Sequence, residues 1–194
     1  MMLTELEPPV LGVEAVRALG DQLRLGTGFA DDGSQDALLE LYLRTAMSAI
    51  ESRIGKALLE RRFSWTVTRW REPDRQALPI APVQAVEELR LVDHLGNQTI
   101  ADRSEWVLAP DGQAPVLRGS WTGDLPEIPE MGRAEVVFRA GYGPDWDDIP
   151  ADLRQATLLL AANYYENRSA DEGRDGAMPF GVLALLEPFR PIRL

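Results

Sequence analysis

The chain has 194 residues, of which 45% are hydrophobic, and its formal net charge at pH 7 is -11. This apolar content is enough for a packed core and argues against a wholly disordered chain. The negative charge disfavours a protein that grips nucleic acid through cations, and the absence of cysteine excludes disulfides and thiolate metal sites.

The first third of the chain predicts two helices. Residues 12–25 carry an apolar stripe that breaks near Gly20, and residues 34–54 repeat apolar side chains every three or four positions. Gly55 stands where a helix commonly ends in a left-handed residue. The acidic loop 31–36 precedes the second helix. Capping explains its aspartates better than calcium binding, because the ligand register of an EF-hand is missing.

The middle of the chain changes to the periodicity of strands. Residues 63–67 alternate between apolar and polar side chains, and a further strand is predicted at 134–140. Turn residues at 96–97 and at 110–112 each lie between two apolar stretches, which predicts hairpins. Residues 58–141 are therefore predicted to form a small antiparallel sheet between two helical regions.

The last third begins with a predicted helix that is apolar on nearly every side over residues 153–165. Pro150 suits its first turn, and the aspartates around that proline favour the positive end of the helix. Such a helix is either central to its own core or shared with neighbouring subunits, and in a chain this small we favour sharing. A short helix is predicted at 179–187, ended by Pro188.

The chain closes with an apolar, basic segment at residues 188–194, which two prolines keep out of a helix. Exposed apolar surface of this kind usually marks an interaction site, so we predict docking onto a partner protein. Folding back onto its own subunit is the alternative. With the preceding helix, the segment supplies these predicted partner-binding residues: Phe180, Leu183, Leu186, Pro188, Phe189, Arg190, Pro191, Ile192, Arg193 and Leu194.

No catalytic or metal-binding pattern is evident. The lone histidine, His94, lies in a predicted turn with no sign of a nucleophile or an orienting carboxylate. Asp145, Asp147 and Asp148 precede a helix, where capping and the helix dipole account for them. A carboxylate-dependent hydrolase that uses these aspartates with His94 is the enzymatic alternative. We expect no enzyme activity, no metal and no cofactor.

Five tryptophans invite a ligand-stacking platform, which is a second binding hypothesis. Most of them fall in or near the predicted sheet, where aromatic side chains usually pack a core or an interface. Stacking on nucleic acid also calls for basic neighbours, which the net charge disfavours. We therefore expect the tryptophans to be structural.

The order of these elements resembles a known family. The residues that carry the likeness are the proline-flanked stretch 78–83, the strand entering 140–143, the helix that begins at 149–156 and ends at 164–168, and the closing stretch 185–190. In these features the chain is similar to the head–tail connector (adaptor) proteins of long-tailed bacteriophages, prophages and gene transfer agents.

The resemblance implies an α+β fold. In this fold an antiparallel helical core carries an inserted small antiparallel β region and a C-terminal docking helix and tail. We expect a single domain over residues 1–194. Its segments are expected to be N-terminal helices at 12–57, the β region at 58–141, C-terminal helices at 148–187 and the docking tail at 188–194.

The resemblance also implies a structural role. The chain would form a ring, a dodecamer in similar proteins, that attaches to the portal protein and joins the capsid to the tail. DNA would pass through the channel without specific binding, and the other partner would be a tail-side neck, stopper or tail terminator protein. A neck or tail-completion protein that contacts the tail only is the alternative.

The expected location is the head–tail junction of a virion or phage-like particle, after assembly in the bacterial cytoplasm. The first seven residues are acidic where a signal peptide would be basic. No stretch approaches the roughly 20 apolar residues that span a bilayer, so no membrane contact is expected.

Overall fold

The computed structural model describes residues 1–24, 35–120, 123–167 and 178–190. It contains helices and antiparallel sheets, so the expected α+β class is confirmed. The chain divides into two compact units. The first, named the β unit, comprises Met1–Pro9 and Gly55–Tyr142, and the second, named the helical unit, comprises Val10–Ile54 and Gly143–Leu194. The single domain expected over the whole chain stays a prediction.

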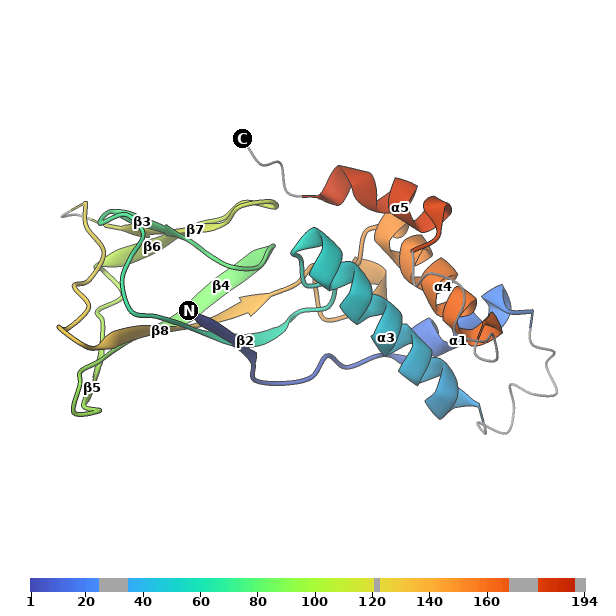
Figure 1. Cartoon of the computed structure of the whole chain (residues 1–194), viewed down its shortest axis with the longest axis horizontal. Coiled ribbons are helices and arrows are strands. Elements are labelled where there is room, and N and C mark those ends of the chain that lie inside the picture. The colour runs from blue at the N-terminus through green and yellow to red at the C-terminus, as the bar shows by residue number, and fades with distance from the viewer. Residues whose placement is uncertain (25–34, 121–122, 168–177, 191–194) are drawn as a thin grey trace. The chain divides into compact units, whose positions relative to one another are not determined.

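The larger sheet of the β unit has five strands in the order β1-β2-β8-β4-β5, and every neighbouring pair is antiparallel (Figure 1). Its strands are β1 (Met2–Glu5), β2 (Arg61–Val67), β8 (Arg133–Ala140), β4 (Val83–Val92) and β5 (Gln98–Ile100). β1 was not predicted. All four of its side chains are exposed, so no burial pattern predicts it. Its pairing with β2 uses backbone groups, and Glu5 also forms an ion pair with Arg61 of β2 at 2.9 Å.

The β unit also contains a second, three-stranded sheet in the order β3-β7-β6. Its strands are β3 (Arg75–Ala77), β7 (Val116–Gly119) and β6 (Trp106–Ala109). The prediction that residues 58–141 form one small sheet was therefore wrong, because their strands belong to two sheets. The hairpins predicted around 96–97 and 110–112 are confirmed as the antiparallel pairs β4–β5 and β6–β7. The turn signals were local and correct, whereas the division into sheets depends on which distant strands pair.

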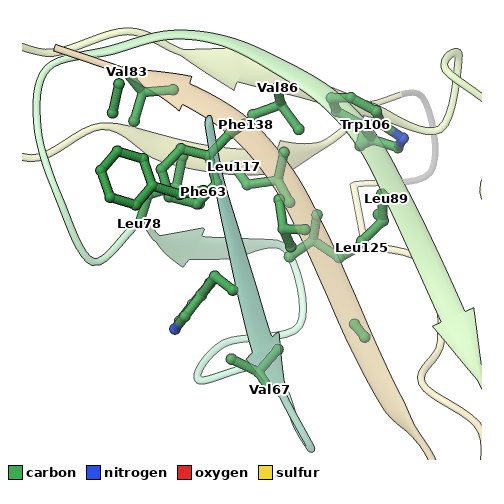
Figure 2. Packing of buried hydrophobic residues seen from close by; sticks show 14 of the residues in the cluster. Phe63, Val67, Leu78, Val83, Val86, Leu89, Trp106, Leu117, Leu125 and Phe138 are labelled. Carbon is green, nitrogen blue, oxygen red and sulfur yellow. The ribbon is translucent and has the colours of Figure 1, made fainter. Parts of the chain in front are cut away.

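One apolar cluster fills the space between these strands (Figure 2). The predicted alternation in β2 is confirmed, because Phe63, Trp65 and Val67 are buried and the residues between them are half-buried. Phe63 stacks on Phe138 of β8 with 5.7 Å between the ring centroids. Leu117 of the smaller sheet lies in the same cluster. Both sheets therefore share one core.

Ion pairs bridge the side of the larger sheet that does not carry these apolar side chains. Glu87 lies 2.9 Å from Arg62 and 3.3 Å from Arg139, and Glu135 lies 3.6 Å from Arg90. Each exposed pair contributes only about 0–1 kcal/mol. The pairs link three neighbouring strands, however, and they place opposite charges beside one another on this face.

The helical unit contains α1 (Val13–Gln22), α3 (Asp36–Ile54), α4 (Ala151–Glu166) and α5 (Phe180–Leu186). α4 packs against each of the other three (Figure 1). Leu153, Leu160 and Ala161 of α4 are buried within the chain itself. The favoured interpretation of this all-apolar helix, sharing with other subunits, is thus corrected, because three helices of the same chain cover it.

Local signals at helix ends were reliable in this unit. α3 ends at Ile54, and Gly55 follows with φ +67°, the left-handed conformation that its position predicted.

Tyr42 of α3 meets Tyr165 of α4 edge-on, with 5.8 Å between the ring centroids. Among the described residues, no helix combines the length and apolar character of a membrane span.

The central placement of α4 predicts an asymmetric effect of truncating its leucines. Leu160→Ala removes a buried side chain and is expected to lower the free energy of unfolding by about 2–5 kcal/mol. Leu158 is half-buried on the same helix, so Leu158→Ala is a matched control with a smaller expected loss. Urea denaturation followed by the helical circular dichroism signal measures both. Equal losses would contradict the placement.

Candidate assembly surface

The acidic residues before α4 are engaged in local structure. They lie at the 3-10 helix η1 (Trp146–Asp148), where Asp145 and Asp148 form a reciprocal capping box. The Asp145 backbone N–H donates to Asp148 Oδ2 at 2.9 Å, and Asp147 forms an ion pair with Arg154. Within the described ranges no three His, Cys, Asp or Glu side chains gather as a metal site would require. The predicted capping role is confirmed for this cluster, whereas most of the loop 31–36 lies outside the described residues.

The turn around His94 is built by its neighbour. Asp93 accepts hydrogen bonds from the Asn97 side chain and from the backbone N–H groups of Asn97 and Leu95, each at 2.8 Å. The Asn97 side chain, and then these N–H groups, hold the pKa of Asp93 below its ordinary value. His94 itself is exposed. It belongs to the β unit, whereas the three aspartates of the hydrolase alternative belong to the helical unit, and no described contact supports that alternative.

The tryptophans are structural where the chain is described. Trp65, Trp106 and Trp146 are buried. Trp70 is half-buried, and its Nε1 donates to the carbonyl of Pro126 at 2.8 Å. Trp121 lies outside the described residues. Four of the five ring systems are thus committed to packing or to a loop, and they do not form an open stacking platform.

The chain has a single lysine, Lys56, and its exposed fraction is only 2%. Its Nζ donates to the backbone carbonyl of Gly112, in the turn between β6 and β7. Burial lowers the pKa of Lys56, and the charge of Asp111 partly offsets this effect. The lysine ties the β6–β7 turn to the segment that precedes β2.

This burial predicts a pH dependence of stability. The pKa of Lys56 is lower in the folded chain than the ordinary value of 10.5, so the unfolded chain binds more protons as the pH approaches 10.5. Stability contributed by this group therefore rises with pH in that window. The free energy of unfolding of the wild type, minus that of Lys56→Met, is expected to increase between neutral pH and 10.5. A difference that is flat or falls in urea titrations would refute the burial effect.

α5 presents two unlike faces. Val182 and Leu186 are buried and lie four residues apart, so they lie on one face of the helix. α5 packs against α4 (Figure 1). Leu183 is half-buried. Phe180, at the first position of the helix, is 85% exposed. Of the predicted partner-binding residues in this helix, Phe180 is thus fully available and Leu186 has no exposed surface in the isolated chain.

The residues after α5 continue in the 3-10 helix η2 (Glu187–Phe189). Pro188 is exposed, Phe189 is half-buried, and Arg190 forms an ion pair with Glu187 at 3.2 Å. The remaining predicted docking residues, Pro191, Ile192, Arg193 and Leu194, lie outside the described residues. Docking by this segment stays a prediction.

Other exposed apolar side chains were missed by sequence reasoning. Leu41 on α3 is 58% exposed, and Met2, Leu3 and Leu6 lie exposed in or beside β1. Leu41 falls inside a strongly apolar helical pattern, which gave no signal that one flank would face outward. The apolar side chains in a short acidic N-terminal stretch were the only available signal for β1.

The chain matches no protein-family model and no curated protein. Among solved structures, it is similar to a chain in the "Neck of empty GTA particle computed with C6 symmetry", with 48% identity, a TM-score of 0.85, and coverage of 100% of this chain and 97% of that one. The family follows from this identity over the full length. The chain belongs to the family of neck proteins of gene transfer agent (GTA) particles.

Two further structures agree with this membership. The "Virion of native gene transfer agent (GTA) particle" contains a chain with 47% identity and a TM-score of 0.84. The "Neck of native GTA particle computed with C12 symmetry" contains one with 42% identity and a TM-score of 0.78. In both cases the match covers 100% of this chain and 97% of the other. The expectation of a phage-like neck component of a virion is confirmed at this level.

Proposed function

We propose that this neck protein is a subunit of the adaptor ring. The ring attaches to the portal protein, joins the DNA-filled capsid to the tail and leaves a central channel for DNA. The observation that carries the proposal is the exposed Phe180 at the start of α5, a helix whose other face is anchored by Val182 and Leu186. The proline-interrupted, basic end of the chain follows this helix directly.

An anchored helix is a suitable way to present a docking side chain. Burying an aromatic side chain of this kind contributes about 1.5–3 kcal/mol. Because α5 is already fixed, little additional ordering entropy opposes binding at Phe180. Arg190 and Arg193 add positive charge to the end of an otherwise acidic chain, so the fitting surface on the portal is an apolar groove with carboxylates at its rim.

A homo-oligomeric ring, specifically a dodecamer, fits the symmetric assemblies that contain similar chains. One of those necks was computed with C12 symmetry and another with C6 symmetry. The net charge of -11 suits a passage that repels phosphates and gives DNA nothing specific to bind. The role requires no enzyme activity and no cofactor. Assembly takes place in the bacterial cytoplasm, and the finished subunit resides at the head–tail junction.

Removing residues 188–194 tests the portal contact. The deletion is expected to weaken binding to the cognate portal at least tenfold, because the apolar and basic side chains of this segment are lost together. Pull-down titration of purified portal with the wild-type and truncated chains measures the effect. Undiminished binding of the truncated chain would sink the docking role of this segment.

A single substitution tests α5 separately. Phe180→Ala is expected to weaken portal binding about tenfold, since it removes the large, 85% exposed aromatic side chain of the helix. Leu41→Ala, at an exposed leucine of α3, is the matched control and is expected to leave binding unchanged. An equal loss in both variants would argue against a specific site at α5.

The same titration with a tail-side component separates the alternative role. A chain that binds the stopper or tail terminator and not the portal would be a tail-completion neck protein. A true adaptor is expected to bind the portal through α5 and the terminal segment, and to bind the tail-side protein even when residues 188–194 are absent.

A further inference from the structure

The loop between β2 and β3, residues 68–74, carries an arginine pair that the function proposed above does not use. Arg69 and Arg71 flank Trp70, and all three residues line two adjoining hollows of about 680 and 560 Å³ in the β unit. We name this segment the arginine loop. Val67, at the end of β2 (Figure 2), and Pro79 give the larger hollow an apolar part.

The backbone of the arginine loop is held firmly. Trp70 donates its Nε1–H to Pro126, and the N–H of Arg71 donates to Gln76 Oε1, both at 2.8 Å. Gln76 is buried and also donates to the carbonyl of Ala77 at 2.9 Å. The carbonyls of residues 73 and 74 accept N–H bonds from Leu125 and Gly119. Such a loop meets a partner with little loss of backbone entropy.

Arg69 and Arg71 differ in their charge environment from most arginines of this unit, a feature that they share with the exposed Arg103 and Arg118. Most of its arginines have a glutamate within 4 Å: Arg61, Arg62, Arg75, Arg90, Arg133 and Arg139. Arg69 and Arg71 are exposed, and within the described residues neither has a carboxylate at that distance. Two cations thus lie together on one fixed loop of an acidic protein, and among the described residues no carboxylate forms an ion pair with either.

We propose that the arginine loop is the basic half of the contact between copies of this chain, and that it receives an acidic segment of the neighbouring subunit. The guanidinium group matches a carboxylate bidentately, which gives both strength and orientation. The apolar part of the hollow accommodates an aliphatic side chain beside the acidic one. The proposal rests on the ring described above and names one of its contact patches.

A second copy is the occupant that the charges favour. A closed ring made of head-to-tail contacts requires two different, complementary patches on each subunit. This chain has 31 acidic against 20 basic residues, so a rare basic patch finds its complement on the surface of another copy. The basic C-terminal segment is disfavoured as the occupant, because Arg190 and Arg193 would face like charges.

DNA is the weaker candidate for this loop. Affinity for the phosphate backbone grows with the number of cations that contact it. Arg69 and Arg71 alone would neutralise about two phosphates, which is few for binding a DNA backbone. Asp124 and Glu127, which line the smaller hollow, would repel either kind of anionic occupant and do not decide between them. A short protein segment that supplies one or two carboxylates fits this small site better.

Photo-crosslinking in assembled particles identifies the occupant. A benzoylphenylalanine placed at the exposed Thr68, which lines both hollows, reports on whatever lies against the loop. In particles assembled from a mixture of light and heavy chains, we expect mixed-isotope cross-links to an acidic peptide of this same protein. Cross-links to DNA or to a different protein, or none at all, would overturn the proposal.

Charge reversal tests the energetics with a matched control. Arg69→Glu combined with Arg71→Glu is expected to lower the number of copies per particle, relative to portal, by tenfold or more, because like charges then meet in the contact. Arg17→Glu combined with Arg53→Glu makes the same change of net charge at exposed arginines of the helical unit and is expected to have little effect. Equal losses in both variants would overturn the proposal.

Portal binding separates this inference from the adaptor role. Single copies of the arginine-loop variant are expected to bind portal like the wild type, because the portal contact is assigned to α5 and the terminal segment. Normal portal binding with failed copy-to-copy assembly supports the inference. If the wild type fails to bind portal while its copies still cross-link through the loop, the adaptor role fails and the loop assignment stands. Normal numbers of the variant per particle overturn the loop assignment.

Discussion

The burial of α4 is the constraint on which the helical unit depends. Most of its leucines and alanines are buried, and the helix packs against α1, α3 and α5, so it serves as the common core of three others. Burying Val182 and Leu186 of α5 against this unit leaves the opposite side of a short helix, with Phe180, facing outward. A helix of seven residues is too short to be stable alone. The order of this helix therefore follows from packing and not from its own propensity.

Charge is organised differently on the polar face of the larger sheet and on the arginine loop. Across the polar face of the larger sheet, glutamates and arginines of neighbouring strands neutralise one another, as Glu87 does with Arg62 and Arg139. Such a face is stable in water and offers a partner little. The arginine loop differs because its backbone is fixed while the side chains of Arg69 and Arg71 lack carboxylate neighbours among the described residues. Unsatisfied charge on a rigid support is the physical basis for a contact there.

The charged residues that were considered for a catalytic or metal site stabilise local structure. Asp145 and Asp148 cap one another's backbone, Asp93 closes the turn beside His94, and the single lysine supports a hairpin turn from inside the β unit. Each of these aspartates and the lysine has a structural partner that accounts for its position.

The sequence by itself determined what depends on neighbouring residues. Helical spacing over 34–54, alternation over 63–67, the left-handed Gly55 and the capping aspartates before α4 were all predictable, because periodicity and end signals act within one or two turns. The order of elements indicated a phage-like neck component, whereas docking by the terminal residues stays a prediction. Leu186 shows the limit of prediction from the sequence. An apolar residue gives the same sequence signal whether its own chain or a partner protein buries it.

Only the tertiary structure decided which distant segments meet. It placed β1 on the open edge of β2, divided the strands into two sheets, and covered α4 with helices from the same chain. It also left Arg69 and Arg71 without the glutamates that most other arginines of the unit have. The residue pattern of a segment indicates that one of its faces is buried or that one of its charges is paired. It does not indicate the partner, because the partner is selected by long-range contacts whose free energies do not depend on the local pattern.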